Sequence, residues 1–161
     1  MKMLSIAMLL IAACGPKEKS LTPGSRSGEG QYRTGTPGEG WGRVAPGGAD
    51  RAWFHRDTGA SIYFDSNCKA RFEDKPLSEL MKHLTFGMAQ GSPLKEEELT
   101  LGGRAALLRV YAGEVDGVIV QLGAVVIKKN TCIYDALFIS SPTGFDAGMP
   151  SFRSVLDGFR T

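Results

Sequence analysis

The sequence predicts an α+β domain, with an antiparallel meander sheet and helices packed against it, after a signal peptide and a disordered tether. Residues 118–127 and 131–139 form apolar runs of strand length. Two further segments, beginning near residues 77 and 150, carry apolar residues at helical spacing. Because the elements are grouped as strands, helix, strands and helix, without regular strand–helix alternation, the pattern favours an antiparallel sheet.

The first predicted strands are short. Residues 41–44 make a brief apolar start that Pro46-Gly47-Gly48 cuts off. Residues 52–55 and 60–65 then read as two strands. The intervening residues 56–59 contain Asp and Gly, which favour turns, so these two strands are expected to form a hairpin.

Two helices and a group of strands complete the predicted domain. The first helix has one apolar face: Leu77, Leu80, Met81, Leu84 and Met88. Strands are expected at residues 96–101, 104–112, 118–127 and 131–139, with turns at Gly102-Gly103 and Asp116-Gly117. The last helix is expected to open at Pro150 and to align Phe152, Val155, Leu156 and Phe159. Since residues 131–139 are apolar on both faces, the sheet should be covered on both sides.

The N-terminus indicates export. Lys2 precedes an apolar run over residues 3–13, which is too short to span a bilayer and fits a signal peptide. Ile11-Ala12-Ala13-Cys14 resembles a bacterial lipobox, in which the cysteine is lipidated; the alternative is an ordinary signal with a chance cysteine. Because Gly15 rather than Asp follows, the usual sorting rule implies a lipid anchor in the outer membrane, facing the periplasm or the cell surface.

These features divide the chain into three parts. Residues 1–13 are the expected signal peptide, and residues 14–40 are the lipidated cysteine and a flexible tether rich in Gly and Pro. Residues 41–161 are expected to form a single globular domain. The net charge of +2 comes without a basic block, so nucleic acid is not an expected partner.

The two remaining cysteines, Cys68 and Cys132, are expected to form a disulfide, because an even pair in an exported domain favours one. The alternatives are two buried thiols or two metal ligands. With only His55 and His83 to help, and no C-x-x-C spacing, no metal site is expected. The sequence also carries no motif for a cofactor.

Asp135 is the candidate site residue. Alternation places it on an apolar face of a central strand, where a carboxylate must be paired or protonated. One hypothesis pairs it with Arg104 or Arg109 to fix the strand register, so that Asp135→Asn would lower stability. The other makes it an acid or base of raised pKa, helped by His55 or His83.

The order of motifs gives one resemblance. It rests on the tryptophan-led start, Cys68 after a strand, Gly103-Arg104, Asp116-Gly117, Cys132-x-Tyr134-Asp135 and the closing Phe-rich helix. Together these resemble exported lipoproteins of delta-proteobacterial type, and their element order is similar to the PsbP/Mog1-like fold. The resemblance implies a binding or assembly scaffold.

No catalytic set stands out, so an enzyme is not the favoured hypothesis. The sequence favours a tethered, non-enzymatic binding module that docks an envelope protein. The alternatives are an envelope hydrolase or transferase that uses Asp135, and a carrier of a small apolar ligand, which needs a cavity between sheet and helix.

Overall fold

The computed structural model describes residues 32–68 and 74–161. The elements follow one another as β1 (Trp41–Arg43), β2 (Arg51–His55), β3 (Ser61–Cys68), α1 (Leu77–Leu84), β4 (Ala89–Leu101), β5 (Arg104–Val115), β6 (Val118–Lys129), β7 (Cys132–Ser140) and α2 (Phe145–Asp157). The predicted signal peptide, Cys14 and residues 15–31 lie outside the described residues.

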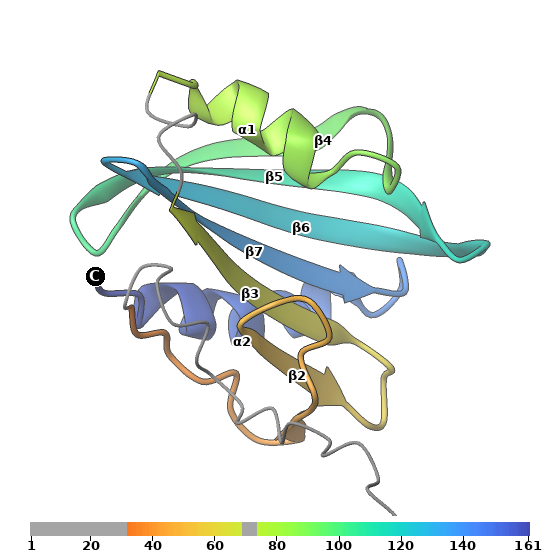
Figure 1. Cartoon of the computed structure of the whole chain (residues 1–161). Coiled ribbons are helices and arrows are strands. Elements are labelled where there is room, and N and C mark those ends of the chain that lie inside the picture. Colours follow the sequence, from red (N-terminus) through yellow and green to blue (C-terminus); the bar gives the residue numbers. More distant parts are fainter. Residues whose placement is uncertain (1–31, 69–73) are drawn as a thin grey trace, which may run out of the picture.

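One seven-stranded sheet organises the described residues, in the order β1-β2-β3-β7-β6-β5-β4. Every neighbouring pair is antiparallel. The strands β4 to β7 form a meander, and the last strand, β7, closes against β3 (Figure 1). The predicted α+β class with an antiparallel sheet is therefore confirmed.

The two helices lie on opposite faces of the sheet (Figure 1). Side chains of β6 alternate between them: Leu122, Ala124 and Val126 pack toward α1, whereas Val125 and Ile127 pack toward α2. This alternation follows from the two-residue repeat of a strand. The sheet thus carries a helix on each face, as the sequence predicts from the apolar residues of 131–139.

The core under α2 is built mainly from aromatic rings. Phe138 of β7 stacks on Phe152 with ring centroids 5.7 Å apart, and its ring centroid lies 5.1 Å from that of Phe145. Gly148 lets the helix approach this closely, because a Cβ at this position would lie 2.4 Å from the Phe138 ring. Fully burying such rings contributes about 1.5–3 kcal/mol each.

The helix boundaries differ from the expected ones. α2 begins at Phe145 and carries Pro150 inside it. The sequence places this start at Pro150. An interior Pro lacks the N–H that a helical turn needs, but burial of Phe145 with Phe152 outweighs that loss. α1 ends at Leu84, where Gly87 takes a positive φ of 79° and turns the chain toward β4.

Residues 32–36, which precede the expected domain start at Trp41, pack against the domain. Arg33 and Arg160 exchange two backbone hydrogen bonds of 2.8 and 3.0 Å, and the Gly35 N–H donates to the Val155 carbonyl at 2.9 Å. The Tyr32 ring stacks on Phe64, with centroids 5.1 Å apart. We call residues 32–36 the N-terminal strap.

Candidate ligand-binding pocket

The short helix α1 packs on β5 and β6 and leaves part of its sheet face open. Over β3 and β7 this face is bordered by the end of α1 and by the loop of residues 46–49. A pocket of about 400 Å³ lies there. It is lined by Pro46, Gly47, Gly48, Ala49, Tyr63, Asp65, Leu84, Asp135 and Leu137.

Two carboxyl groups come together on this pocket. Asp65 of β3 and Asp135 of β7 are paired in the sheet register, so their side chains leave the same face side by side. The Asp135 Oδ1 is enclosed and accepts no hydrogen bond. Burial raises the pKa of the Asp135 carboxyl to about 7, and the charge of Asp65 adds to that rise. The pocket therefore holds a carboxyl group that can change protonation near neutral pH.

Neither arginine considered from the sequence reaches Asp135. Arg104 is exposed at the start of β5. Arg109 donates from Nε to the Glu96 Oε2 on β4, at 2.6 Å. The expected Asp–Arg pair is therefore replaced by a pair of aspartates.

Neither histidine shares the pocket. His55 packs edge-on against Trp41, with ring centroids 5.2 Å apart, on the α2 side of the sheet. His83 is exposed on α1, where its Nε2 lies 3.9 Å from the Glu79 Oε1. The structure thus brings Asp135 together with Asp65, which the sequence did not single out as its partner.

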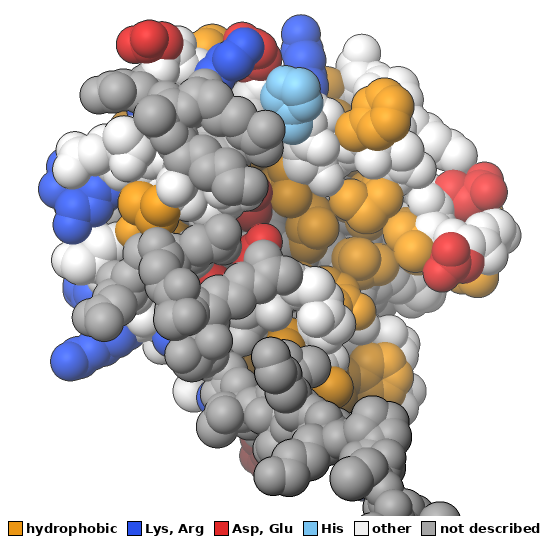
Figure 2. Space-filling view, viewed as in Figure 1, with side chains coloured by type: hydrophobic (Ala, Val, Ile, Leu, Met, Phe, Trp, Pro, Cys, Tyr) orange, Lys and Arg blue, Asp and Glu red, His pale blue; other side chains and the backbone are white. Residues whose placement is uncertain are grey.

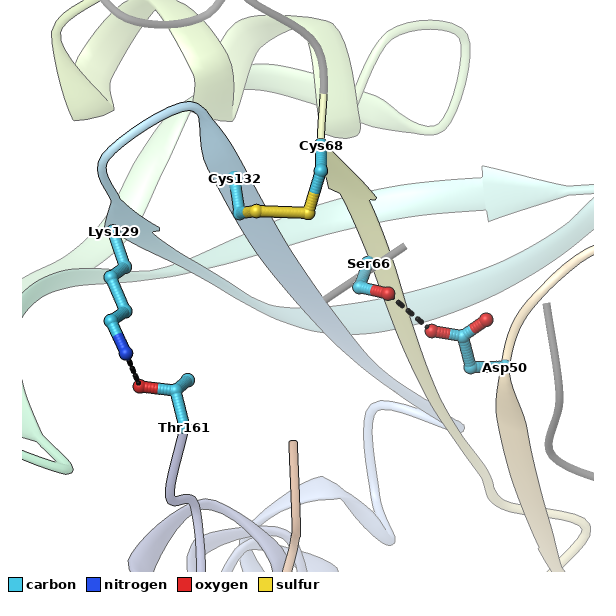
Figure 3. The surroundings of a disulfide bond; sticks show 6 residues. All are labelled: Asp50, Ser66, Cys68, Lys129, Cys132 and Thr161. Carbon is cyan, nitrogen blue, oxygen red and sulfur yellow. Dashed lines mark hydrogen bonds between the residues drawn. A yellow bond between two sulfur atoms is a disulfide. The ribbon is translucent and has the colours of Figure 1, made fainter. Parts of the chain in front are cut away.

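A disulfide joins Cys68 to Cys132 on the same pair of strands, but on the opposite face of the sheet from the pocket (Figure 3). The two cysteines are paired at the end of the β3–β7 ladder that also pairs Asp65 with Asp135. The bond thus ties together the two strands whose register sets the aspartate pair. Beside it, the Ser66 hydroxyl donates to the Asp50 carboxylate at 2.7 Å (Figure 3).

A second hollow, of about 630 Å³, lies on the same side of the sheet between the start of α1 and strands β4 and β5. Its polar lining includes Glu96 and Glu98 from β4 and Arg109 from β5. The Glu96 carboxylate is already bonded to the Arg109 guanidinium, so this hollow holds an ion pair rather than two carboxyl groups held side by side. We therefore take the Asp65–Asp135 pocket as the candidate site.

Large apolar side chains are exposed at one end of the sheet. Phe86, Leu94, Val118 and Ile119 are 87, 64, 61 and 60% exposed. They lie near where β4 begins, β5 ends and β6 begins, since Ala89 pairs with Gly113 and Val115 with Val118. Val118 points to the α1 side of β6, as Val120 and Leu122 do, whereas Ile119 points to the opposite side. We call these four residues the apolar end surface, which extends around this end of the sheet. Hydrophobic side chains also gather on the α1 side of the molecule (Figure 2).

The described residues contain no group of three or more His, Cys, Asp or Glu side chains arranged to hold a metal ion. Among these residues, no helix has both the length and the apolar character needed to cross a bilayer.

The comparisons with known proteins give the fold. No protein-family model and no curated protein matches the sequence. A solved structure of LpqN from Mycobacterium tuberculosis, described as involved in cell envelope biogenesis, matches with a TM-score of 0.54 and 15% identity over 86% of this chain and 88% of that chain. PsbP (CyanoP) from Synechocystis matches with a TM-score of 0.50 and 18% identity over 86% and 98%. This chain is similar to both in fold, which agrees with the PsbP-like order of elements.

Proposed function

We propose that this protein is a lipid-anchored binding module of the cell envelope, which docks a protein partner and catalyses no reaction itself. The lipobox-like Ile11-Ala12-Ala13-Cys14 supports the anchor, and Gly15 supports delivery to the outer membrane. The Cys68–Cys132 disulfide supports an oxidising compartment, where such bonds persist. The fold shared with LpqN, a protein described as involved in cell envelope biogenesis, is consistent with this location.

The observation that carries the binding role is the apolar end surface. Water-exposed aromatic and aliphatic side chains that are gathered in one area are typical of a protein interface. Phe86, at 87% exposure, is the residue with most apolar area to bury. Glu114, which is paired with Ile119 in the sheet, and Gln90 are exposed at the same end, joined by a 3.4 Å hydrogen bond, and would form part of a polar rim.

The alternative of an envelope hydrolase rests on the aspartate pair. A carboxyl group with a pKa of about 7 suits general acid catalysis at neutral pH. The described residues that line the pocket include no histidine, serine or cysteine that would complete a nucleophile–base pair. We therefore favour the binding role over hydrolysis by the aspartate pair.

Site-specific photo-crosslinking in intact envelopes tests the docking role. A photoreactive residue at Val118, on the α1 side, should give one discrete adduct, whereas the same residue at Asp157, exposed at the end of α2, should give none. In a Phe86→Lys background the Val118 adduct should disappear while the melting temperature stays unchanged. Absence of an adduct at Val118, or an equal pattern at both positions, would contradict docking at this surface.

A further inference from the structure

We infer that the pocket between α1 and the loop of residues 46–49 is a binding site for an alkylammonium group, that is, a cationic nitrogen on a short aliphatic stem. This site is separate from the apolar end surface, and it does not depend on the docking role proposed for that surface. The inference rests on the charge of the pocket, on its lining and on one unsatisfied oxygen.

The charge comes from Asp135 and Asp65, which the sheet register holds side by side. The Asp135 Oδ1 has no donor in the folded chain, although an enclosed carboxylate needs hydrogen bonds or a counter-charge. An ammonium supplies a positive charge and three N–H donors. An ammonium group thus supplies the hydrogen-bond donor and the counter-charge that the Asp135 Oδ1 lacks.

The lining is suited to an aliphatic stem. Leu84 of α1, Leu137 of β7 and Pro46 of the loop line the pocket with the Tyr63 ring. The volume of about 400 Å³ lies in the range of small-ligand sites. Lysine-like stems pack on such apolar walls while the charged end meets a polar group. The pocket therefore combines an apolar wall with an anionic floor.

A bare metal ion fits this lining less well. Calcium takes six to eight oxygen ligands, and magnesium requires a near-octahedral set. The pocket offers the carboxylates of Asp65 and Asp135, and its other lining side chains are aliphatic or aromatic. The chemistry therefore favours an organic cation.

The other charged and titratable groups around Asp135 come from three elements. Tyr63 and Asp65 lie on β3, on the same face as Asp135. Lys128 of β6 lies on this face too, and its Nζ donates to the Lys75 carbonyl at 3.0 Å. On α1, Lys82 and His83 are exposed. Between pH 6 and pH 8 we therefore expect the protonation of Asp135 itself to dominate ligand binding.

The experiment uses the full chain with Cys14→Ser, which removes the predicted lipid attachment and leaves every described residue unchanged. The probes are hexylammonium and its neutral counterpart hexanol, followed by amide chemical shifts and by the pH titration of the Asp135 carboxyl carbon. With a pKa of about 7, the ionised fraction of Asp135 rises roughly tenfold from pH 6 to pH 8. Hexylammonium should bind about tenfold more tightly at pH 8, whereas hexanol should show no such gain.

A matched variant and a ligand-induced shift complete the test. Asp135→Asn should weaken hexylammonium binding at pH 8 by about tenfold or more, while Asp157→Asn should leave it unchanged. Hexylammonium should also lower the apparent pKa of Asp135 in the chain with natural pocket residues. This measurement does not depend on a substitution in the pocket. Equal binding of hexanol and hexylammonium, or an Asp135 titration that hexylammonium leaves unmoved, would overturn the inference.

The same ammonium can come from a free amine or from a lysine side chain of a partner. A peptide, acetyl-Leu-Lys-Leu-amide, provides the second arm. Tighter binding of the peptide would assign the pocket to a lysine of a partner, and tighter binding of hexylammonium would assign it to a small amine. Failure of both probes to bind would overturn the inference and leave the crosslinking result at Val118 untouched.

Discussion

Asp65 and Asp135 face each other across β3 and β7, on the part of the sheet face that α1 leaves open. Two carboxylates at directly opposed positions repel each other. The same ladder ends in the Cys68–Cys132 disulfide, which links the two strands covalently. The fold thus maintains a pair of acids that local interactions alone would disfavour, and such pairs are frequent at functional sites.

Asp135→Asn should stabilise the protein at high pH, which is opposite to the effect expected for an aspartate paired with an arginine. Burial raises the pKa of Asp135 to about 7 in the folded state, well above the usual value of about 3.9 in an unfolded chain. Between about pH 4 and pH 7 the folded state therefore holds a proton that the unfolded state has released, and stability falls as the pH rises through this window. The asparagine side chain carries no charge, so the Asp135→Asn variant should not lose this stability as the pH rises.

Urea unfolding at pH 4 and pH 8 measures the effect. We expect Asp135→Asn to gain roughly 2–4 kcal/mol over the natural chain at pH 8 and to differ little from it at pH 4. Asp157→Asn, at an exposed position, controls for the loss of one negative charge. A variant that is less stable than the natural chain at pH 8 would show that Asp135 is paired after all.

Removing the disulfide should lower stability strongly. Cys68 and Cys132 are 64 residues apart, and closing a loop of this size contributes about 4 kcal/mol in the chain-entropy model. We expect Cys68→Ser combined with Cys132→Ser to lose about this much in urea unfolding. Mass spectrometry of the unreduced digest should show the two peptides linked, and two alkylatable thiols in exported protein would refute the bond.

Tyr32→Phe should destabilise the domain although residue 32 lies before the expected domain start. The Tyr32 hydroxyl donates to the Asp50 carboxylate at 2.9 Å, and burial together with Asp50 raises the pKa of that hydroxyl. A hydrogen bond to a charged group contributes about 1.5–3 kcal/mol, so a loss in this range is expected. Tyr32→Ala should lose more, because the ring also stacks on Phe64.

The same unfolding curves decide whether the N-terminal strap is part of the domain. If neither Tyr32→Phe nor Tyr32→Ala changes the unfolding midpoint, the domain starts nearer Trp41, as the sequence suggested. Arg43→Ala, on the short edge strand β1, provides a comparison at an exposed position in the same region.

Local pattern was enough to predict the antiparallel class, the tight turns and that the strands exist, although β4 begins at Ala89 rather than at residue 96. Asp116 and Gly117 take positive φ values of 51° and 79° in the hairpin where the sequence expects a turn. Alternation likewise placed Asp135 on an inner strand face. These features depend on residues close together in the chain, so one sequence suffices for them.

Long-range pairing accounts for what the sequence did not predict. The partner of Asp135 is set by the register between β3 and β7, which are far apart in the chain. The early start of α2 and the docking of Tyr32 depend on burial against rings such as Phe138 and Phe64. The exposure of Phe86 follows from the early end of α1 at Leu84. Each depends on tertiary contacts that periodicity does not encode.

The central claim is that a lipid at Cys14 holds this domain in the cell envelope, and metabolic labelling with a radioactive fatty acid tests it most directly. In envelope fractions the natural chain should be labelled, shortened by its first thirteen residues and recovered with the outer membrane, whereas Cys14→Ser should be unlabelled and released. Label on the Cys14→Ser chain, or an uncut natural chain in the cytosolic fraction, would contradict the account.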